Sequence, residues 1–524
     1  MPYQCPKSDA CRLPRPLFAA RNAAALRGAA LLFVVAWGID ARRAAAFDLS
    51  DVSAKAQKLA EESFRDPKGQ VPEWLTEITY DQWRDVRFRP ENALWRDRHV
   101  PFQVQFFHPG LYYDRTVAVN VVDGKKVGPL QFSPSQFDYG RTDFASKVPQ
   151  NLGYAGFRIH TPIKTPNYFD EVIVFLGASY FRALGKQQVF GISARGIAID
   201  TALPTGEEFP YFKEFWLVTP APGAKDLTMY AMLDSPSLTG AYRFVIKPGE
   251  QTAVEIDARL FLRREVQRLG VAPLTSMFFH GENTLRPFED FRPEVHDSDG
   301  LLLNFASGEW LWRPIDNPRT LNVSGLRIPD PKGFGLLQRD RDFDHYQDLE
   351  THAEMRPSVW IAPRGNWGEG RMELVEIPTK SDTNDNVVVF WTPEKQPKPG
   401  EAVAYAYTMY WYGDDQTRPP GGRVIATRRD RGTAENAHRF VVDFASKKLD
   451  ALPPETVLRG VITIASGEGS AELLDQQVAK SPATGGWRLT FQVRPKGKDP
   501  VELRAFLDKG GDTLTETWSY VILP

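Results

Sequence analysis

Apolar and polar residues alternate along most of the chain, in short segments that are separated by turn residues. Representative segments are Thr116–Val122, Tyr242–Ile246 and Val387–Trp391, and the turn pair Asp123-Gly124 follows the first of them. Alternation with a period of two residues, bounded by Gly, Pro, Asn and Asp, is typical of β-strands. The pattern therefore predicts an all-β protein, and the length of the chain favours large sandwiches over one small barrel.

Three short segments have helical spacing instead. Ser50–Phe64 places Val52 and Ala56 on one face, which predicts an amphipathic helix near the start of the mature chain. Ser179–Leu184 and Arg259–Leu269 are weaker candidates for helices.

A stretch rich in Pro and Lys, residues 392–400, has no periodicity and is predicted to be a linker. We then expect residues 47–391 to form a large N-terminal β-sandwich and residues 401–524 to form a smaller immunoglobulin-like one. The second domain lacks the Cys…Trp…Cys pattern of antibody domains. Its expected strands are short and regularly spaced: Val403–Trp411, Arg439–Phe444, Val457–Ile464, Trp487–Val493, Val501–Leu507 and Thr515–Leu523.

The first 46 residues differ from the rest of the chain. A basic segment precedes the apolar run Gly28–Ile39, and the small residues Ala44, Ala45 and Ala46 follow it. This order is typical of a secretory signal peptide, and the apolar run is too short to span a bilayer comfortably. We therefore expect residues 1–46 to be removed and the mature protein to begin at Phe47 outside the cytoplasm.

Removing the leader changes the charge and the cysteine count. Residues 1–46 contain seven Lys and Arg against two Asp, so the formal net charge falls from −2 to −7. An acidic mature chain argues against binding of nucleic acid. Both cysteines, Cys5 and Cys11, lie in the leader, which excludes disulfides, thiolate metal sites and a cysteine nucleophile from the mature protein.

Polar and aromatic residues are densest between His280 and Asp385. Sugars offer apolar ring faces and hydroxyl edges, so a glucan site needs aromatic platforms beside hydrogen-bonding side chains. The alternative is that the tryptophans fill a sandwich core and the charges line solvated loops. The candidate platforms are Trp310, Trp312, Trp367 and Tyr346, and the candidate edge contacts are Gln338, Arg339, His345 and Gln347.

Glycoside hydrolysis requires two carboxyl groups, and the residues alone do not rank the candidates in this segment. The segment Asp297–Gly300 begins like a calcium loop but lacks the downstream ligands, so a turn is expected there. His296 and His345 are better interpreted as hydrogen-bonding residues than as zinc ligands, and neither a metal nor a cofactor is expected. The eligible carboxylates are Asp297, Asp299, Asp340, Asp342, Asp348 and Asp385.

Several long motifs carry a family resemblance. The chain resembles the family of periplasmic glucan biosynthesis proteins G and D over essentially all of its mature length, and it is more similar to the G branch because its leader lacks a twin-arginine motif. The motifs are Phe47–Ala60, Gly110–Tyr113, Pro293–Leu301, Glu309–Pro314, Gly333–Phe343 and Glu376–Thr379.

The resemblance implies a galactose-mutarotase-like large sandwich and a role in making osmoregulated periplasmic glucans, whose backbone is β-1,2-linked glucose. It also implies kinship with glycoside hydrolases that cut or rearrange this backbone. By motif, the general acid falls on Asp385 and the second catalytic residue on Asp297, although Asp382 lies only three residues before Asp385. The glucan contacts expected beside them are His296, Asp299 and Asn384.

The expected partners follow from the same resemblance. They are β-1,2-glucan itself, the membrane glucosyltransferase that makes it, and a second copy of the chain. The long loop within Trp411–Arg423 would lie near the glucan groove in such a homodimer, unless it is an ordinary mobile loop.

Overall fold

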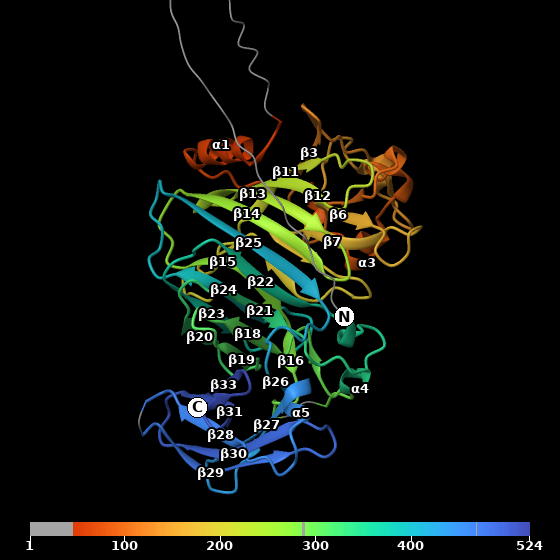
Figure 1. Cartoon of the computed structure of the whole chain (residues 1–524). Coiled ribbons are helices and arrows are strands. Elements are labelled where there is room, and N and C mark those ends of the chain that lie inside the picture. Colours follow the sequence, from red (N-terminus) through yellow and green to blue (C-terminus); the bar gives the residue numbers. More distant parts are fainter. Residues whose placement is uncertain (1–45, 286–288, 468) are drawn as a thin grey trace, which may run out of the picture. The chain divides into compact units, whose positions relative to one another are not determined.

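The computed structural model describes residues 46–285, 289–467 and 469–524 (Figure 1). The leader predicted at residues 1–46 lies outside them except for its last residue. The described chain consists mainly of β-sheet, which confirms the all-β prediction. None of its helices has the length and apolar character needed to cross a membrane. The α-helices are α1 (Leu49–Ala60), α2 (Glu73–Thr76), α3 (Tyr80–Asp85), α4 (Phe343–Tyr346) and α5 (Lys447–Asp450).

One of the two large sheets has ten strands. Nine of them form a continuous path, and β10 (Ile197–Ile199) pairs with β15 beside it. In spatial order the path is β2 (Gln103–Phe107), β6 (Gly156–Thr161), β7 (Asp170–Leu176), β8 (Tyr180–Ala183), β9 (Ser193–Arg195), β15 (Leu269–Ser276), β24 (Val387–Pro393), β23 (Gly370–Glu376) and β20 (Asn322–Arg327).

The other large sheet has fifteen strands and continues into the C-terminal part of the chain. A short strand, β32 (Asp512–Thr513), pairs with β31 beside the main path. In spatial order the path is β28 (Arg459–Ile464), β31 (Val501–Lys509), β33 (Thr517–Ile522), β19 (Trp310–Pro314), β18 (Gly300–Asn304), β21 (Gly333–Leu337), β22 (Ser358–Arg364), β25 (Ala402–Tyr412), β14 (Thr252–Leu262), β13 (Leu238–Lys247), β12 (Leu227–Asp234), β11 (Tyr211–Val218), β3 (Ala118–Asp123) and β4 (Lys126–Pro129).

The main core lies between these two sheets. Phe157 and Phe175 of the ten-stranded sheet pack edge-to-face on Phe215 of the fifteen-stranded sheet, with ring centroids 4.8 and 5.7 Å apart. All three rings are buried. Each buried aromatic side chain contributes about 1.5–3 kcal/mol to the free energy of unfolding by leaving water. The inward-facing apolar residues of the strands therefore hold the two sheets of the large sandwich together.

Helix α1 covers the outer face of the fifteen-stranded sheet at β13 (Figure 1). Asp48 caps its start by accepting the Ser50 N–H at 2.7 Å, and Val52 and Ala56 are buried against the sheet. The helix predicted at Ser50–Phe64 is thereby confirmed, although it ends at Ala60.

The other two predicted helices are wrong, because both segments contain strand and loop residues and no helix. Ser179–Leu184 contains β8, in which Phe181 and Ala183 face the core while Arg182 is exposed. Arg259–Leu269 contains the end of β14, which is paired on both sides, with β13 and β25. In both places ladder pairing and burial override a weak helical spacing.

The smaller sandwich combines a four-stranded sheet with β28, β31 and β33 of the fifteen-stranded sheet. Its core includes Phe440, Phe491 and Trp518, and the edge-to-face contact of Phe491 with Trp518 spans 5.7 Å between centroids. The four strands in spatial order are β26 (Arg423–Arg431), β27 (His438–Ala445), β30 (Trp487–Pro495) and β29 (Ala471–Lys480).

The segment expected as a linker, residues 392–400, joins β24 in one sheet of the large sandwich to β25 in the other. Strand β25 pairs with β14 and β22, so it belongs to the large sandwich. By strand pairing, the smaller sandwich therefore starts at β26, after the loop that follows Tyr412.

Candidate functional site

A two-stranded ribbon, β16 (Phe278–His280) with β17 (Val295–His296), brings the two predicted catalytic residues together. Asp297 donates its backbone N–H to the Met277 carbonyl at 2.8 Å. The next residue, Phe278, donates its N–H to the Asn386 side chain at 2.8 Å and accepts a bond from the same amide at 3.0 Å. Asp297 and Asp385 therefore flank one short strand although they are far apart in sequence.

The two carboxyl groups have different surroundings. Asp297 is buried and forms an ion pair with Arg356, whereas Asp385 is exposed in the loop before β24. Burial raises the pKa of Asp297, Arg356 opposes the rise, and the charge of Asp385 adds to it. A carboxylate with a raised pKa is a stronger base near neutral pH. The exposed Asp385 can thus donate a proton while the buried Asp297 accepts one.

Asn386 is the residue that fixes this geometry. It is buried, and its amide donates to the Phe278 and Ile377 carbonyls at 3.0 Å each. We expect Asn386→Ala to lower the free energy of unfolding by about 2–3 kcal/mol, because buried backbone groups lose their partners. Urea denaturation measures the loss. The exposed neighbour Asn384→Ala is the control, and equal losses in the two variants would contradict the assigned role.

Arg292 connects three acidic residues, and one of them, Asp382, lies in the same loop as Asp385. Its guanidinium donates to Asp290 at 2.8 Å, to Asp382 at 2.9 Å and to Asp348 at 3.4 Å. The hydrogen bond with Arg292 lowers the pKa of Asp290 to about 2. Asp382 is held in an ion pair by this contact, which distinguishes it from its neighbour Asp385.

Three predicted glucan contacts form a buried network. His296 hydrogen-bonds Gln338 through Nδ1 and Glu294 through Nε2, both at 2.9 Å. Gln338 donates to the Tyr346 hydroxyl at 2.6 Å. His296, Gln338 and Tyr346 are at most 1% exposed, and the bond between His296 and Gln338 joins β17 to the segment that follows β21. Burial alone would lower the pKa of His296, but the hydrogen bond to Glu294 and the charges of Glu294, Asp299 and Asp340 together raise it.

Arg339 is engaged with other side chains of the protein. Its guanidinium lies 3.6 Å from the centroid of the Trp312 ring and forms a double ion pair with Glu516. Trp310 stacks on Trp360 at 5.5 Å. Trp312 and Trp360 belong to the same buried core as Phe491 and Trp518 of the smaller sandwich, so they help to join the two sandwiches.

Trp367 lies apart from this site. It is buried against Trp391 in the main core and lines a separate cavity of about 510 Å³ beside the start of α1. The structure therefore does not bring it to Asp297 and Asp385. Asn384 and Gln347 are exposed. Gln347 ends α4 in the left-handed conformation, and its amide donates to Asp344 at 2.9 Å.

A second group of side chains surrounds a narrow cavity of about 30 Å³ next to the ribbon. Glu294, Asp299 and Asp340 line it, and His345 hydrogen-bonds Asp340 at 2.6 Å. This bond raises the pKa of His345 to about 9. Sequence reasoning missed Glu294, Arg292, Arg356 and Asn386, although Glu294 lies within the motif Pro293–Leu301 and Arg292 directly precedes it.

The fold and the site define an all-β protein of two sandwiches with a carboxylate-rich site on its large sandwich. The chain belongs to the family described as periplasmic glucan biosynthesis protein, MdoG, whose profile matches residues 47–522. This match confirms the family resemblance read from the motifs.

A glucans biosynthesis protein G from Ralstonia nicotianae is 49% identical over 92% of this chain and 97% of its own length. One of the same name from Dickeya dadantii is 43% identical over 91% and 93%. Among solved structures, a galactose mutarotase related enzyme from Lactobacillus acidophilus covers 45% of this chain and 95% of its own, at 8% identity and a TM-score of 0.20.

Proposed function

We propose that this protein takes part in periplasmic glucan biosynthesis by cutting or transferring the β-1,2-linked glucose backbone. The family description and the names of the relatives support the role in glucan biosynthesis. The catalytic part of the proposal rests on one observation, the placement of Asp297 and Asp385 on either side of the Met277-Phe278 backbone. The charge of one carboxyl group acts on the other across this strand.

In the proposed reaction Asp385 donates its proton to the glycosidic oxygen as the bond from that oxygen to the anomeric carbon breaks. A water molecule adds to the anomeric carbon, and its proton passes through a sugar hydroxyl to Asp297. In a transfer reaction a second sugar hydroxyl takes the place of the water. The buried position of Asp297 and its raised pKa support its role as the proton acceptor.

One observation favours a second candidate function. The Asp297 carboxylate is already paired with the Arg356 guanidinium, which reduces its strength as a base. A protein with this pair could bind glucan without cutting it and act as an export factor beside the membrane glucosyltransferase. Both candidates place the mature protein in the periplasm after removal of the leader, as the family description supports.

The two candidates differ in their products. Under the catalytic proposal, purified protein incubated with linear β-1,2-glucan yields shorter or cyclic chains. Their length and anomeric configuration are measured by chromatography and proton NMR. Glucans with β-1,3 or β-1,4 linkages serve as controls and remain intact. Binding of β-1,2-glucan without a change in chain length would favour the second candidate, and no binding at all would contradict both.

A further inference from the structure

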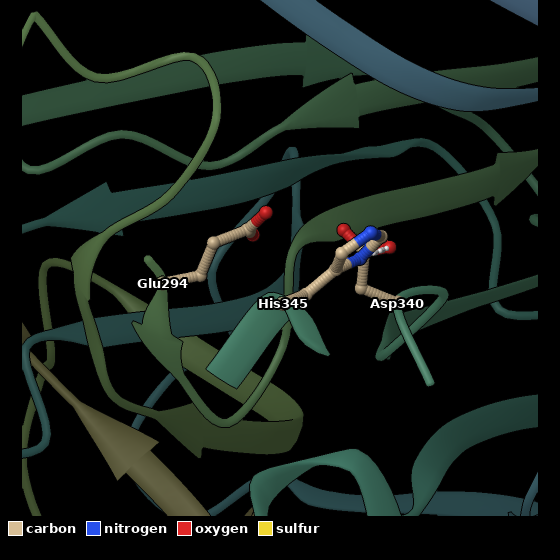
Figure 2. Close-up of side chains that lie close together, drawn as sticks. All are labelled: Glu294, Asp340 and His345. Atoms are coloured by element: carbon tan, nitrogen blue, oxygen red, sulfur yellow. Dashed lines mark hydrogen bonds and ion pairs between the residues drawn. The ribbon is translucent and has the colours of Figure 1, made fainter. Parts of the chain in front are cut away.

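Three side chains with metal-binding atoms approach one another from separate segments of the large sandwich. Glu294 precedes β17, Asp340 follows β21, and His345 lies in α4. One ligand atom from each lies within 4.8 Å of the other two. Figure 2 shows the three side chains reaching into the same space, with His345 hydrogen-bonded to Asp340. Sequence reasoning treated His345 as a hydrogen-bonding residue only, because its acidic neighbours in space are distant in sequence.

A buried carboxylate oxygen provides an independent observation at the same place. Asp299 Oδ2 accepts the backbone N–H groups of Arg339 and Asp340, at 2.9 and 3.0 Å. Asp299 Oδ1 is buried and has no hydrogen-bond partner among the described residues. Asp299, Glu294 and Asp340 line the same narrow cavity. An unsatisfied buried carboxylate oxygen is costly, and a cation in the cavity would satisfy it.

The charges around the cavity also favour a bound cation. Glu282 lines it as well, so four carboxylates face one small space. The nearby guanidinium groups are occupied, since Arg339 pairs with Glu516 and Arg428 with Glu282. Burial and the charge of Asp340 raise the pKa of Asp299, and burial raises that of Glu282 to about 8. A divalent cation in the cavity would stabilise the charged forms of both carboxyl groups.

We propose that Glu294, Asp340 and His345, together with Asp299, bind one divalent transition-metal ion of the Zn²⁺ or Mn²⁺ class. Carboxylate oxygens with one imidazole nitrogen suit these ions, whereas Ca²⁺ and Mg²⁺ prefer oxygen ligands throughout. Binding exchanges the proton shared by His345 and Asp340 for the metal, and this proton is released to water. The ion would link β17, β21 and α4 and so fix the segment that leads into Asp297. The proposal is independent of the catalytic role of that residue.

The test uses the untagged mature protein after treatment with EDTA and dialysis. Titration calorimetry with ZnCl₂ and MnCl₂ is expected to show one ion bound per chain, and much weaker binding of MgCl₂ and CaCl₂. The bound transition-metal ion is also expected to raise the melting temperature, measured by thermal denaturation. Substoichiometric or undetectable binding of both transition metals by the folded protein would overturn the proposal.

Substitutions locate the ion. His345→Asn and Asp340→Asn are expected to weaken binding at least about 100-fold, since the loss of outer partners alone costs about 10–100-fold. His352→Asn is the matched control, because its side chain is 42% exposed against 44% for His345 and its partner is Glu354 outside the cluster. Circular dichroism confirms that each variant folds. Equal affinities in the His345 and His352 variants would place the ion elsewhere and overturn the proposal.

Discussion

Replacement of Asp385 by Asn is expected to lower the rate of β-1,2-glucan cleavage by about 10²–10⁴-fold, which is the usual contribution of a general acid. The amide has nearly the same shape as the carboxyl group but has no acidic proton to give to the leaving oxygen. Asp385 is exposed, so the substitution should leave folding and glucan binding intact. Initial rates of product formation and the dissociation constant for glucan, measured on the same preparation, separate the two effects.

Asp382→Asn is the matched comparison for this experiment, because it removes the same charge from the same loop. Asp382 is held by Arg292 at 2.9 Å, so its loss should loosen the loop and cost far less activity. A larger loss in the Asp382 variant would reassign the general acid to that position. Unchanged product formation in both variants would contradict the catalytic proposal as a whole.

Much of the fold was predictable from the sequence, because a half-buried strand shows as alternation and a fully buried strand as a short apolar run. Trp487–Val493 alternates in part, whereas Val387–Trp391 is buried throughout and shows as a continuous apolar run. Strands β26 and β29 were missed, since both are partly exposed and rich in charged or polar residues. The membership of β25 in the large sheet depends on pairing with distant strands, which no local pattern of residues encodes.

The site was less predictable than the fold. The family resemblance nominated Asp297 and Asp385, and the structure places them on either side of the Met277-Phe278 backbone. Composition also nominated Gln338 and Tyr346, but composition does not distinguish a polar side chain that faces solvent from one that is buried in a hydrogen-bonded network. The cluster around His345 was not visible at all, because its members come from three segments of the chain.

Replacement of Arg339 is expected to have the second large effect, this time on stability. Its guanidinium makes two contacts with Glu516, at 2.5 and 3.0 Å, and donates to the Val424 carbonyl at 2.7 Å. The Arg339 side chain is 7% exposed and that of Glu516 is completely buried. Arg339→Met would leave the Glu516 charge buried without its partner. We expect this variant to lose about 3–5 kcal/mol in the free energy of unfolding.

The double variant Arg339→Met/Glu516→Met separates the contribution of the ion pair to stability from that of the packing. Replacing both charges with apolar groups removes the desolvation cost together with the attraction, so most of the lost stability should return. Guanidinium chloride denaturation of both variants measures this recovery, and Arg327→Met, which breaks the exposed pair with Glu369, serves as the control. A single variant as stable as the wild type would contradict the structural role. If Arg339→Met stays folded but loses glucan affinity, the prediction of Arg339 as a glucan contact is supported. Unchanged affinity beside reduced stability is the expected outcome, because the guanidinium joins the end of β21 to the smaller sandwich and faces Glu516.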